Sequence, residues 1–530
     1  MPKPNPSKPQ SSDSAGLLSE VGSKIVHYIQ AGYPGLYLVS AEEQRVEAEL
    51  KAVVAQLNTV LKRDSKSAYT LCYWSVVSGL VHTDANKVQE LNDPLQMLEA
   101  VEGLKENTVV LLKDFHLFLS DPNPMLLRKL KDTLLHAKTA QKLLIILGCR
   151  LCLPPELEHE LTVVEFSLPG KPELRAVLGG VMESAGITNL DVEIREKAVE
   201  AAAGLTTIEA ENAFSLSFVQ SRAIEPGIIA AEKAQAVKKS GLLEIVEVKE
   251  TLNSIGGLNC LKDWLVRRKD AFSQRAQAYG LPAPKGLLIL GIPGTGKSLT
   301  AKATAAVFNL PLLRLDAGKL YGGIVGQSEA NVRAVIQTAE AIAPCCLWID
   351  ELEKGFAGSK SSGTTDGGTS ARVFGSFLSW MQEKSKPVFV VATANDVSQL
   401  PPELLRKGRF DEIFFVDLPN QNEREAIWSI VVSAKRRDPS AYDLQQLARA
   451  SDGLTGAEIE AVFNEAMFVG FERSKEPADL DIAGVLSGFA PLSKLMAEQI
   501  AALKSWAANR ARPATSTPDA EERKLRKLGM

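Results

Sequence analysis

The sequence has no apolar run that approaches the roughly 20 residues needed to span a bilayer. It also has no excess of basic residues, because 60 lysines and arginines are outnumbered by 64 aspartates and glutamates, for a net charge of −4. That balance argues against a general nucleic-acid binder. Residues 1–20 contain no arginine and no apolar core segment, which disfavours a transit peptide and a secretory signal and predicts a disordered lead.

Histidine and cysteine are scarce. All five histidines lie in the first half of the chain, at His27, His82, His116, His136 and His159. Histidine-based acid–base or zinc chemistry therefore cannot serve the second half. The six cysteines lie mostly on apolar runs, which suits a reducing cytosol or stroma better than a disulfide framework. Cys149 and Cys152 could be half of a zinc site, but no second pair has ligand spacing, which disfavours a metal or redox role.

A glycine-rich loop follows the apolar run 287–290. Its residues are Gly291, Ile292, Pro293, Gly294, Thr295, Gly296, Lys297 and Ser298, and Leu299 begins the alanine-rich run that follows. Glycines let backbone N–H groups turn inward around phosphate oxygens, and a following helix presents its positive end to the same anion. Lys297 can reach the terminal phosphates and Ser298 can ligate Mg²⁺. We therefore expect nucleotide binding here.

The surrounding pattern predicts an α/β domain with a parallel sheet and a helical lid. Candidate strands occupy residues 287–290, 312–316, 345–349, 388–393 and 413–416, with helical stretches between them. Candidate lid helices occupy residues 421–436, 441–450, 455–474 and 478–487. In a parallel sheet of this kind the ligand lies at the carboxyl ends of the strands. We expect a large domain over 241–419, a lid over 420–495 and a charged tail over 496–530.

The first half contains a diverged repeat of the second. Leu153-Pro-Pro-Glu-Leu157 recurs as Leu400-Pro-Pro-Glu-Leu404, and the segment starting at Gly204 resembles the segment starting at Gly453. Upstream, the run 109–114 matches the strand that ends in Asp350. Matches in the same order at similar spacing indicate a tandem of two related domains. The first copy would occupy residues 21–240.

The first copy has lost the residues that handle phosphate. In place of the glycine-rich loop it has the segment 35–43, which ends in Glu42 and Glu43, and those carboxylates would repel phosphate. In this alignment Phe115 stands where Glu351 stands. We expect the first copy to be a structural or partner-binding module.

Two carboxylates end the strand 345–349. Asp350 is expected to face Mg²⁺ through water, while Glu351 can orient and deprotonate the attacking water. The strand 388–393 leads to Asn395, whose amide can hold that water or sense the γ-phosphate. Surface acids at strand ends are common, but pairing with a phosphate loop about fifty residues upstream favours the catalytic interpretation.

Arg406 and Arg409 flank a Lys-Gly turn. Guanidinium groups stabilise the charge that develops in phosphoryl transfer, and we expect both arginines to serve the nucleotide of a neighbouring subunit. The alternative is that they are ordinary surface arginines. Arg372 could relay the same interface or equally be a surface residue.

Together these motifs resemble those of AAA ATPases over residues 250 to 490. The block from Leu400 to Asp411 is similar to the second region of homology that marks this family. The resemblance implies ATP with Mg²⁺ and a ring, commonly a hexamer, with nucleotide between subunits. It also implies that Ile255-Gly256 touch adenine and that Gly456-Ala457 lie near the base. The degenerate first copy and the loop from Tyr321 to Glu329 together are most similar to the divergent AAA proteins of plastid and cyanobacterial genomes, a family known as a hypothetical chloroplast reading frame.

The sequence departs from that of AAA unfoldases at a position that affects substrate threading. AAA unfoldases carry an aromatic residue in the pore loop where this sequence has Ile324, and Tyr321 lies three residues early. A branched aliphatic side chain grips an extended polypeptide less well than an aromatic ring. The Gly/Ser/Thr-rich stretch 358–370 would face the same pore, either as a substrate loop or as a plain connection.

These features leave two functions to distinguish. The first is an ATP-hydrolysing ring that remodels a protein partner docked through the degenerate copy. The alternative is a nucleotide-dependent assembly switch or scaffold that threads no substrate. A nucleic-acid motor is disfavoured because no basic stripe lines the Ile324 loop.

Overall fold

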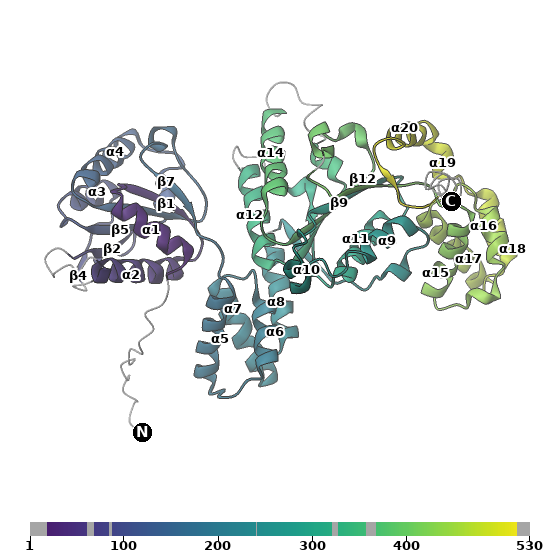
Figure 1. The fold of residues 1–530 in the computed structure, drawn as a ribbon, viewed down its shortest axis with the longest axis horizontal. Coiled ribbons are helices and arrows are strands. Elements are labelled where there is room, and N and C mark those ends of the chain that lie inside the picture. The colour runs from purple at the N-terminus through teal and green to yellow at the C-terminus, as the bar shows by residue number, and fades with distance from the viewer. Residues whose placement is uncertain are drawn as a thin grey trace. The chain divides into compact units, whose positions relative to one another are not determined.

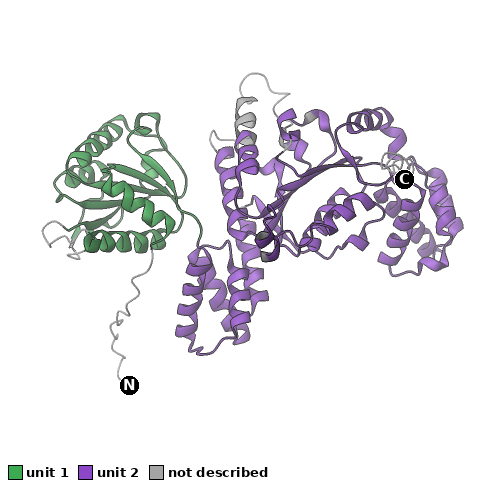
Figure 2. Cartoon of the chain, in the orientation of Figure 1, with its two compact units in different colours: residues 1–168 green, residues 169–530 purple. Residues whose placement is uncertain are grey.

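The computed structural model describes residues 18–60, 68–83, 87–239, 241–320, 327–356, 367–406 and 408–516. The chain divides into two compact units, residues up to 168 and residues 169 onward (Figure 2). Each unit contains one seven-stranded sheet. No single helix among the described residues has the length and hydropathy of a membrane span. One pair of segments, 479–495 and 497–507, passes that test only when joined across a 54° bend.

The sheet of unit 1 is mainly parallel and has the order β4-β3-β2-β5-β6-β1-β7. Its strands are β1 (Gly35–Val39), β2 (Thr70–Ser75), β3 (Gly79–His82), β4 (Lys87–Gln89), β5 (Thr108–Lys113), β6 (Leu143–Gly148) and β7 (Thr162–Glu165). Its helices are α1 (Glu20–Gln30), α2 (Glu43–Val60), α3 (Pro94–Glu102), α4 (Pro124–Thr139) and the 3₁₀ turns η1 (Phe115–Phe118) and η2 (Pro155–Leu157). Buried residues alternate along the strands, so α1 and α2 pack on one face and α3 and α4 on the other.

Unit 2 begins with four helices that form a bundle with its own core. They are α5 (Lys171–Ala185), α6 (Val192–Ala202), α7 (Thr207–Ser221) and α8 (Pro226–Lys239). The bundle packs on the following domain, because a Cβ on Gly204 would lie 2.3 Å from Ile342 and Val237 belongs to the core beneath the sheet. These helices were predicted to close the first copy at residue 240. In the structure the compact unit ends at Leu168, and the bundle belongs to unit 2.

The sheet of unit 2 has the order β14-β13-β9-β12-β11-β10-β8. Its strands are β8 (Leu243–Val246), β9 (Gly286–Gly291), β10 (Leu312–Asp316), β11 (Cys345–Asp350), β12 (Val388–Ala394), β13 (Glu412–Val416) and β14 (Arg512–Pro513). Strands β10, β11, β12, β9 and β13 pair in parallel, as the hydrophobic pattern predicts. Strand β8 pairs antiparallel with β10 at one edge.

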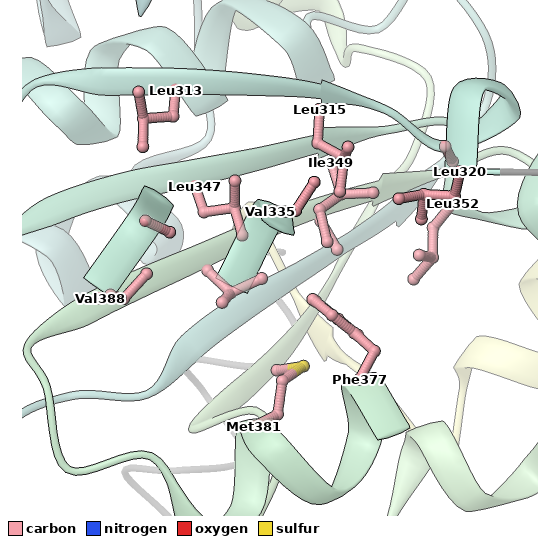
Figure 3. Close-up of a cluster of buried hydrophobic side chains, with 14 of the residues drawn as sticks. Leu313, Leu315, Leu320, Val335, Leu347, Ile349, Leu352, Phe377, Met381 and Val388 are labelled. Carbon is pink, nitrogen blue, oxygen red and sulfur yellow. The ribbon is translucent and has the colours of Figure 1, made fainter. Parts of the chain in front are cut away.

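Helices cover both faces of this sheet (Figure 1). They are α9 (Asn259–Val266), α10 (Gln274–Tyr279), α11 (Lys297–Phe308), α12 (Gln327–Ile342) and α14 (Gly367–Glu383), with the 3₁₀ turns η3 (Leu252–Ser254), η4 (Ala317–Leu320), η5 (Leu352–Phe356), η6 (Val397–Gln399) and η7 (Pro402–Leu405). In Figure 3, Val335 of α12 and Phe377 and Met381 of α14 lie against sheet residues that include Leu347 and Ile349. Helices α9 and α11 cover the opposite face.

A second helical bundle follows the sheet and has a core centred on Trp428 and Phe463. Its helices are α15 (Gln421–Ala434), α16 (Leu444–Ala450), α17 (Gly456–Glu472) and α18 (Asp479–Gly488), with the turn η8 (Pro439–Ala441). The lid predicted over 420–495 corresponds to this bundle. Beyond it, α19 (Leu492–Leu495), α20 (Ala497–Ala507) and β14 follow. Residues expected to be only a charged tail thus include a strand that joins the sheet beside β13.

The two sheets share one topology. Order β2-β5-β6-β1-β7 in unit 1 matches order β10-β11-β12-β9-β13 in unit 2. The bundles match as well, because α7 and α17 both begin with a threonine capping box, Thr206 with Glu209 and Thr455 with Glu458. The shared topology agrees with the internal repeat that the sequence predicts.

Candidate functional site

The glycine-rich loop connects β9 to α11 at the carboxyl end of the sheet. Gly294 has φ 78° and Gly296 has φ 90°, both in the left-handed region that side chains disfavour. Thr295 Oγ1 donates to Ile292 O at 2.7 Å and closes the turn. Ser298 and Leu299 are exposed in the first turn of α11. The loop therefore has the backbone form that a phosphate cradle requires.

Lys297 is the cation of this loop and is only 7% exposed. Its Nζ donates to Gly291 O at 2.9 Å and to Ile292 O at 2.7 Å. Burial lowers the pKa of Lys297 to about 8, although nearby Glu353, Asp350 and Glu351 act in the opposite direction. A buried ammonium beside three carboxylates marks the electrostatic centre of the site.

Asp350 and Glu351 lie where β11 ends, beside β12. Thr393 Oγ1 donates to Asp350 Oδ1 at 2.7 Å and accepts from Glu351 N at 3.1 Å. Arg314 on β10 approaches the second oxygen of Asp350 at 3.6 Å. Glu351 has φ 49° and pairs with Lys354. Thr393 and Arg314 were not among the predicted site residues, although Thr393 belongs to the strand that leads to Asn395.

Glu353 connects the acidic strand end to Asn395. Its Oε1 accepts a hydrogen bond from Asn395 N at 2.9 Å, and its Oε2 is buried with no hydrogen-bond partner among the described residues. Burial raises the pKa of Glu353. Glu353 was not among the predicted site residues, although a third acid two positions after Glu351 was a visible signal.

Of the two predicted adenine-contacting segments, Ile255-Gly256 packs against the lid and Gly456-Ala457 belongs to it. A Cβ on Gly256 would lie 2.4 Å from Ile427 of α15. At α17, Ala457 N donates to Gly294 O at 3.1 Å, and a Cβ on Gly456 would lie 3.6 Å from the same oxygen. Ile255 is buried. The structure thus brings Gly456 and Ala457 into contact with the phosphate loop.

Glu423 of the lid holds three segments together. Its Oε1 accepts from Leu258 N at 3.1 Å and from Thr515 Oγ1 at 2.6 Å. Its Oε2 caps the start of α15 through Asn420 N at 3.0 Å. Because Leu258 follows the Ile255-Gly256 segment, this one carboxylate links that segment, the lid and the residues that follow β14. No local sequence pattern indicates this junction.

The two predicted arginines differ in their surroundings. Arg406 is exposed, whereas Arg409 is half-buried and its guanidinium donates to Glu403 O. Gly408 between them has φ 98°. The side chain of Arg372, the Tyr321–Ile324 segment and residues 357–366 of the Gly/Ser/Thr-rich stretch lie outside the described residues.

Strand register identifies the equivalent positions in unit 1. Lys113 ends β5 as Asp350 ends β11, and Asp114 follows with φ 54° as Glu351 follows with φ 49°. Asp114 N bonds to Leu147 of β6, as Glu351 N bonds to Thr393 of β12. The alignment of Phe115 with Glu351 was therefore wrong by one residue.

The corrected register shows a charge inversion in unit 1. Helix α2 begins with Glu43 where α11 begins with Lys297, and Lys113 replaces Asp350. Lys113 Nζ pairs with Glu43 at 2.8 Å and also with Glu47. The two positions therefore carry charges opposite to those of Lys297 and Asp350, and in unit 1 their side chains neutralise each other. Only residues 40–42 connect β1 to α2, whereas residues 292–296 connect β9 to α11.

Comparison with known proteins agrees with this architecture. Residues 287–418 match the ATPase family associated with various cellular activities (AAA). Residues 21–166 match the SpoVK-like AAA ATPase N-terminal domain, and residues 172–240 match the second domain of the same proteins. The chain is 41% identical over 493 residues to the AAA domain-containing protein ycf46 of Trieres chinensis, covering 92% of this chain and 96% of that protein. The chain belongs to the AAA ATPase family.

Other AAA proteins extend the comparison. The ycf46 protein of Guillardia theta is 40% identical over 485 residues, covering 90% of this chain and 93% of that protein. The cell division cycle protein 48 homolog of Archaeoglobus fulgidus is 32% identical over 236 residues, covering 42% of this chain and 31% of that protein. The ycf46 similarity thus extends through both units, as the predicted resemblance to chloroplast reading-frame proteins requires.

Proposed function

We propose that this AAA protein hydrolyses ATP at the carboxyl edge of the unit 2 sheet and uses the reaction to remodel a protein partner. One observation carries the proposal: Thr393 holds the Asp350–Glu351 strand end and Glu353 holds Asn395, at the same sheet edge from which the phosphate loop leaves β9. Family membership supports nucleotide chemistry.

The chain's own residues have distinct parts in this proposal. The loop 291–299 would hold the phosphates, with Lys297 as the cation. Ser298 and Asp350 would hold Mg²⁺, which would neutralise phosphate charge. Glu351 would orient and deprotonate water, and Asn395 would hold that water in line. Ile255 and Gly256 would contact adenine, with Gly456 and Ala457 on the lid side.

The residues present fit this ligand pair. Two left-handed glycines shape the loop, and a buried lysine lies among carboxylates whose repulsion a metal cation would relieve. Glu353 Oε2 is buried and has no hydrogen-bond partner among the described residues, so the site retains an oxygen that can accept a further hydrogen bond. In unit 1 the corresponding positions pair with each other, and we assign no nucleotide to it.

Arg406 and Arg409 would complete the site of an adjacent subunit in a homo-oligomeric ring, with a hexamer as the expected size. The exposed position of Arg406 supports this role. Unit 1 would dock the partner. The six cysteines are free, which suits work in a reducing cytosol or stroma.

Turnover and client trapping test the proposal together. A remodelling ATPase should show steady turnover that rises with its partner and disappears in Glu351→Gln, and that variant should retain ATP and co-purify with its client. Lys297→Ala should lose nucleotide binding or turnover. ATP-dependent assembly with very low turnover would instead favour the switch or scaffold function, which Ile324 in the pore-loop position supports. Salt-dependent stimulation of ATP turnover by DNA would overturn both the remodelling function and the switch or scaffold function.

A further inference from the structure

The carboxyl edge of the unit 1 sheet carries a cluster of reactive side chains. With Lys113 equivalent to Asp350, the register places Asp114 at the position of Glu351 and His116 at the position of Glu353. Strand pairing independently places Cys149 at the position of Asn395, because Gly148 and Ala394 end the matching strands β6 and β12. The degenerate copy thus has a cysteine, a histidine and an aspartate where the ATPase copy has its polar site.

The imidazole of His116 approaches Cys149 with one ring nitrogen and Asp114 with the other. His116 Nε2 lies 3.7 Å from Cys149 Sγ, and His116 Nδ1 lies 3.9 Å from Asp114 Oδ1. His116 is 2% exposed, and its Nδ1 has no hydrogen-bond partner among the described residues. A Cβ on Gly148 would lie 2.8 Å from the imidazole Cγ, so glycine is needed at that position to seat the ring. The ring is therefore fixed with one nitrogen toward the thiol.

The environment keeps His116 in the form that accepts a proton. Burial lowers the pKa of His116, and Arg150 acts in the same direction. Asp114 and a hydrogen bond to the Leu147 backbone act in the opposite direction, but the net effect is a lowered pKa. The imidazole is consequently neutral at pH 7. Asp114 favours the tautomer with hydrogen on Nδ1, which leaves the Nε2 lone pair facing Cys149.

The thiol is accessible and its loop is anchored. Cys149 is exposed. Tyr37 Oη donates to Arg150 O at 2.6 Å and accepts from Cys152 N at 3.1 Å, which ties the loop 149–152 to β1. The same sheet contains a second thiol–imidazole pair, Cys72 and His82 at 3.3 Å, but Cys72 is 1% exposed. Of these two pairs, only Cys149 and His116 combine a neighbouring base with a solvent-exposed thiol.

We propose that Cys149 of unit 1 is a nucleophilic thiol, with His116 as its base, that exchanges with low-molecular-weight disulfides. Cys149 passes its proton to His116 Nε2, and the thiolate attacks one sulfur of the disulfide. As the new S–S bond forms, the old S–S bond breaks, and the departing thiolate takes the proton from His116. Cys149 is oxidised to a mixed disulfide and the departing half is reduced to a thiol. The structure thus favours the thiol role that the cysteine spacing alone disfavours.

The test uses the full chain with glutathione disulfide, and peptide mass mapping locates the modified cysteine. At pH 7 Cys149 should be modified at least about tenfold faster than Cys260, which is partly exposed, and Cys72 should stay unmodified. In His116→Asn the Cys149 rate should fall at least about tenfold at pH 7. It should change little at pH 10, where thiols ionise without a base.

Asp114→Asn is a second variant that protects the test against misfolding. The Asp114 side chain is 70% exposed, and asparagine tolerates its left-handed φ of 54°. This variant should lower the Cys149 rate at pH 7 by a smaller factor than His116→Asn. The proposal is overturned if, at pH 7, Cys149 reacts as fast in both variants as in the chain without substitutions. It is also overturned if Cys149 reacts no faster than Cys260.

Discussion

Thr393 holds Asp350 through a hydrogen bond of 2.7 Å from its hydroxyl. The same hydroxyl accepts from Glu351 N at 3.1 Å, so one oxygen fixes both the expected metal ligand and the backbone of the expected base. Thr393 belongs to the neighbouring strand β12 and lies two residues before Asn395. The placement of Asp350, Glu351 and Asn395 therefore depends on the pairing of β11 with β12.

Replacing this hydroxyl should slow hydrolysis more than it weakens binding. Thr393→Val removes two hydrogen bonds, each worth about 1 kcal/mol, and turnover should fall roughly tenfold or more. Thr393→Ser keeps the hydroxyl and is the control. Steady-state ATPase assays and nucleotide titrations measure the two effects. Equal turnover in the Val and Ser variants would show that the hydroxyl has no part in positioning Asp350.

Arg406 should act on the nucleotide of a neighbouring subunit. Arg406→Ala should leave ATP affinity nearly unchanged and lower turnover by about 10³-fold, because a guanidinium stabilises the transition state more than the ground state. Lys297→Ala should be inactive for a different reason. Mixing the two inactive variants should restore activity, since one supplies the arginine and the other the intact loop. No recovery, or full hydrolysis by a dilute monomer, would contradict a shared site.

Lys233 on α8 should make stability depend on pH. Burial lowers its pKa to about 8 in the folded chain, against 10.5 for an exposed lysine. Below pH 8 the fold contains a buried ammonium, and between pH 8 and 10.5 the unfolded chain binds more protons. Stability therefore rises with pH in that window.

Lys233→Met should accordingly stabilise unit 2 by about 3 kcal/mol at pH 7, with the gain shrinking toward pH 10. Lys238→Met, at an exposed position of the same helix, is the control. Thermal unfolding at both pH values measures the difference. A pH-independent effect would show that hydrophobicity and not desolvation is responsible.

The strand β14 should contribute to the stability of the ATPase domain. Ala514 is 0% exposed, its N donates to Phe415 O at 2.9 Å, and its O accepts from Leu261 N at 3.1 Å. Ala514→Asp buries an unpaired charge and should cost several kcal/mol, seen as a lower Tm. Pro513→Asp changes the adjacent exposed position in the same way and should be nearly neutral. Equal Tm values for the two variants would contradict this docking.

The sequence predicted the central scaffold well. Buried apolar runs ending in polar residues identified the parallel strands of unit 2, because a strand covered on both faces has few other residue patterns available. The phosphate loop was equally readable, since the two left-handed glycines and Lys297 are fixed by local backbone geometry.

Long-range contacts were not readable from the sequence. The bond from Glu423 to Thr515 joins residues 92 positions apart, and no local pattern announces it. The placement of Asp114 failed for a related reason: sequence similarity aligned the acids, whereas strand ends and left-handed φ values fix the register. Glu353 was missed because its partner is a backbone N–H, which has no signature in the sequence.

The short turn at residues 40–42 has an evolutionary consequence. Substitutions alone could restore a lysine or an aspartate to unit 1, but they could not return the missing length of backbone that wraps a triphosphate. An insertion would have to arise together with changes at both ends of the Lys113–Glu43 pair. A triphosphate pocket could therefore return to unit 1 only through several concerted changes, which leaves this half of the molecule open to other tasks.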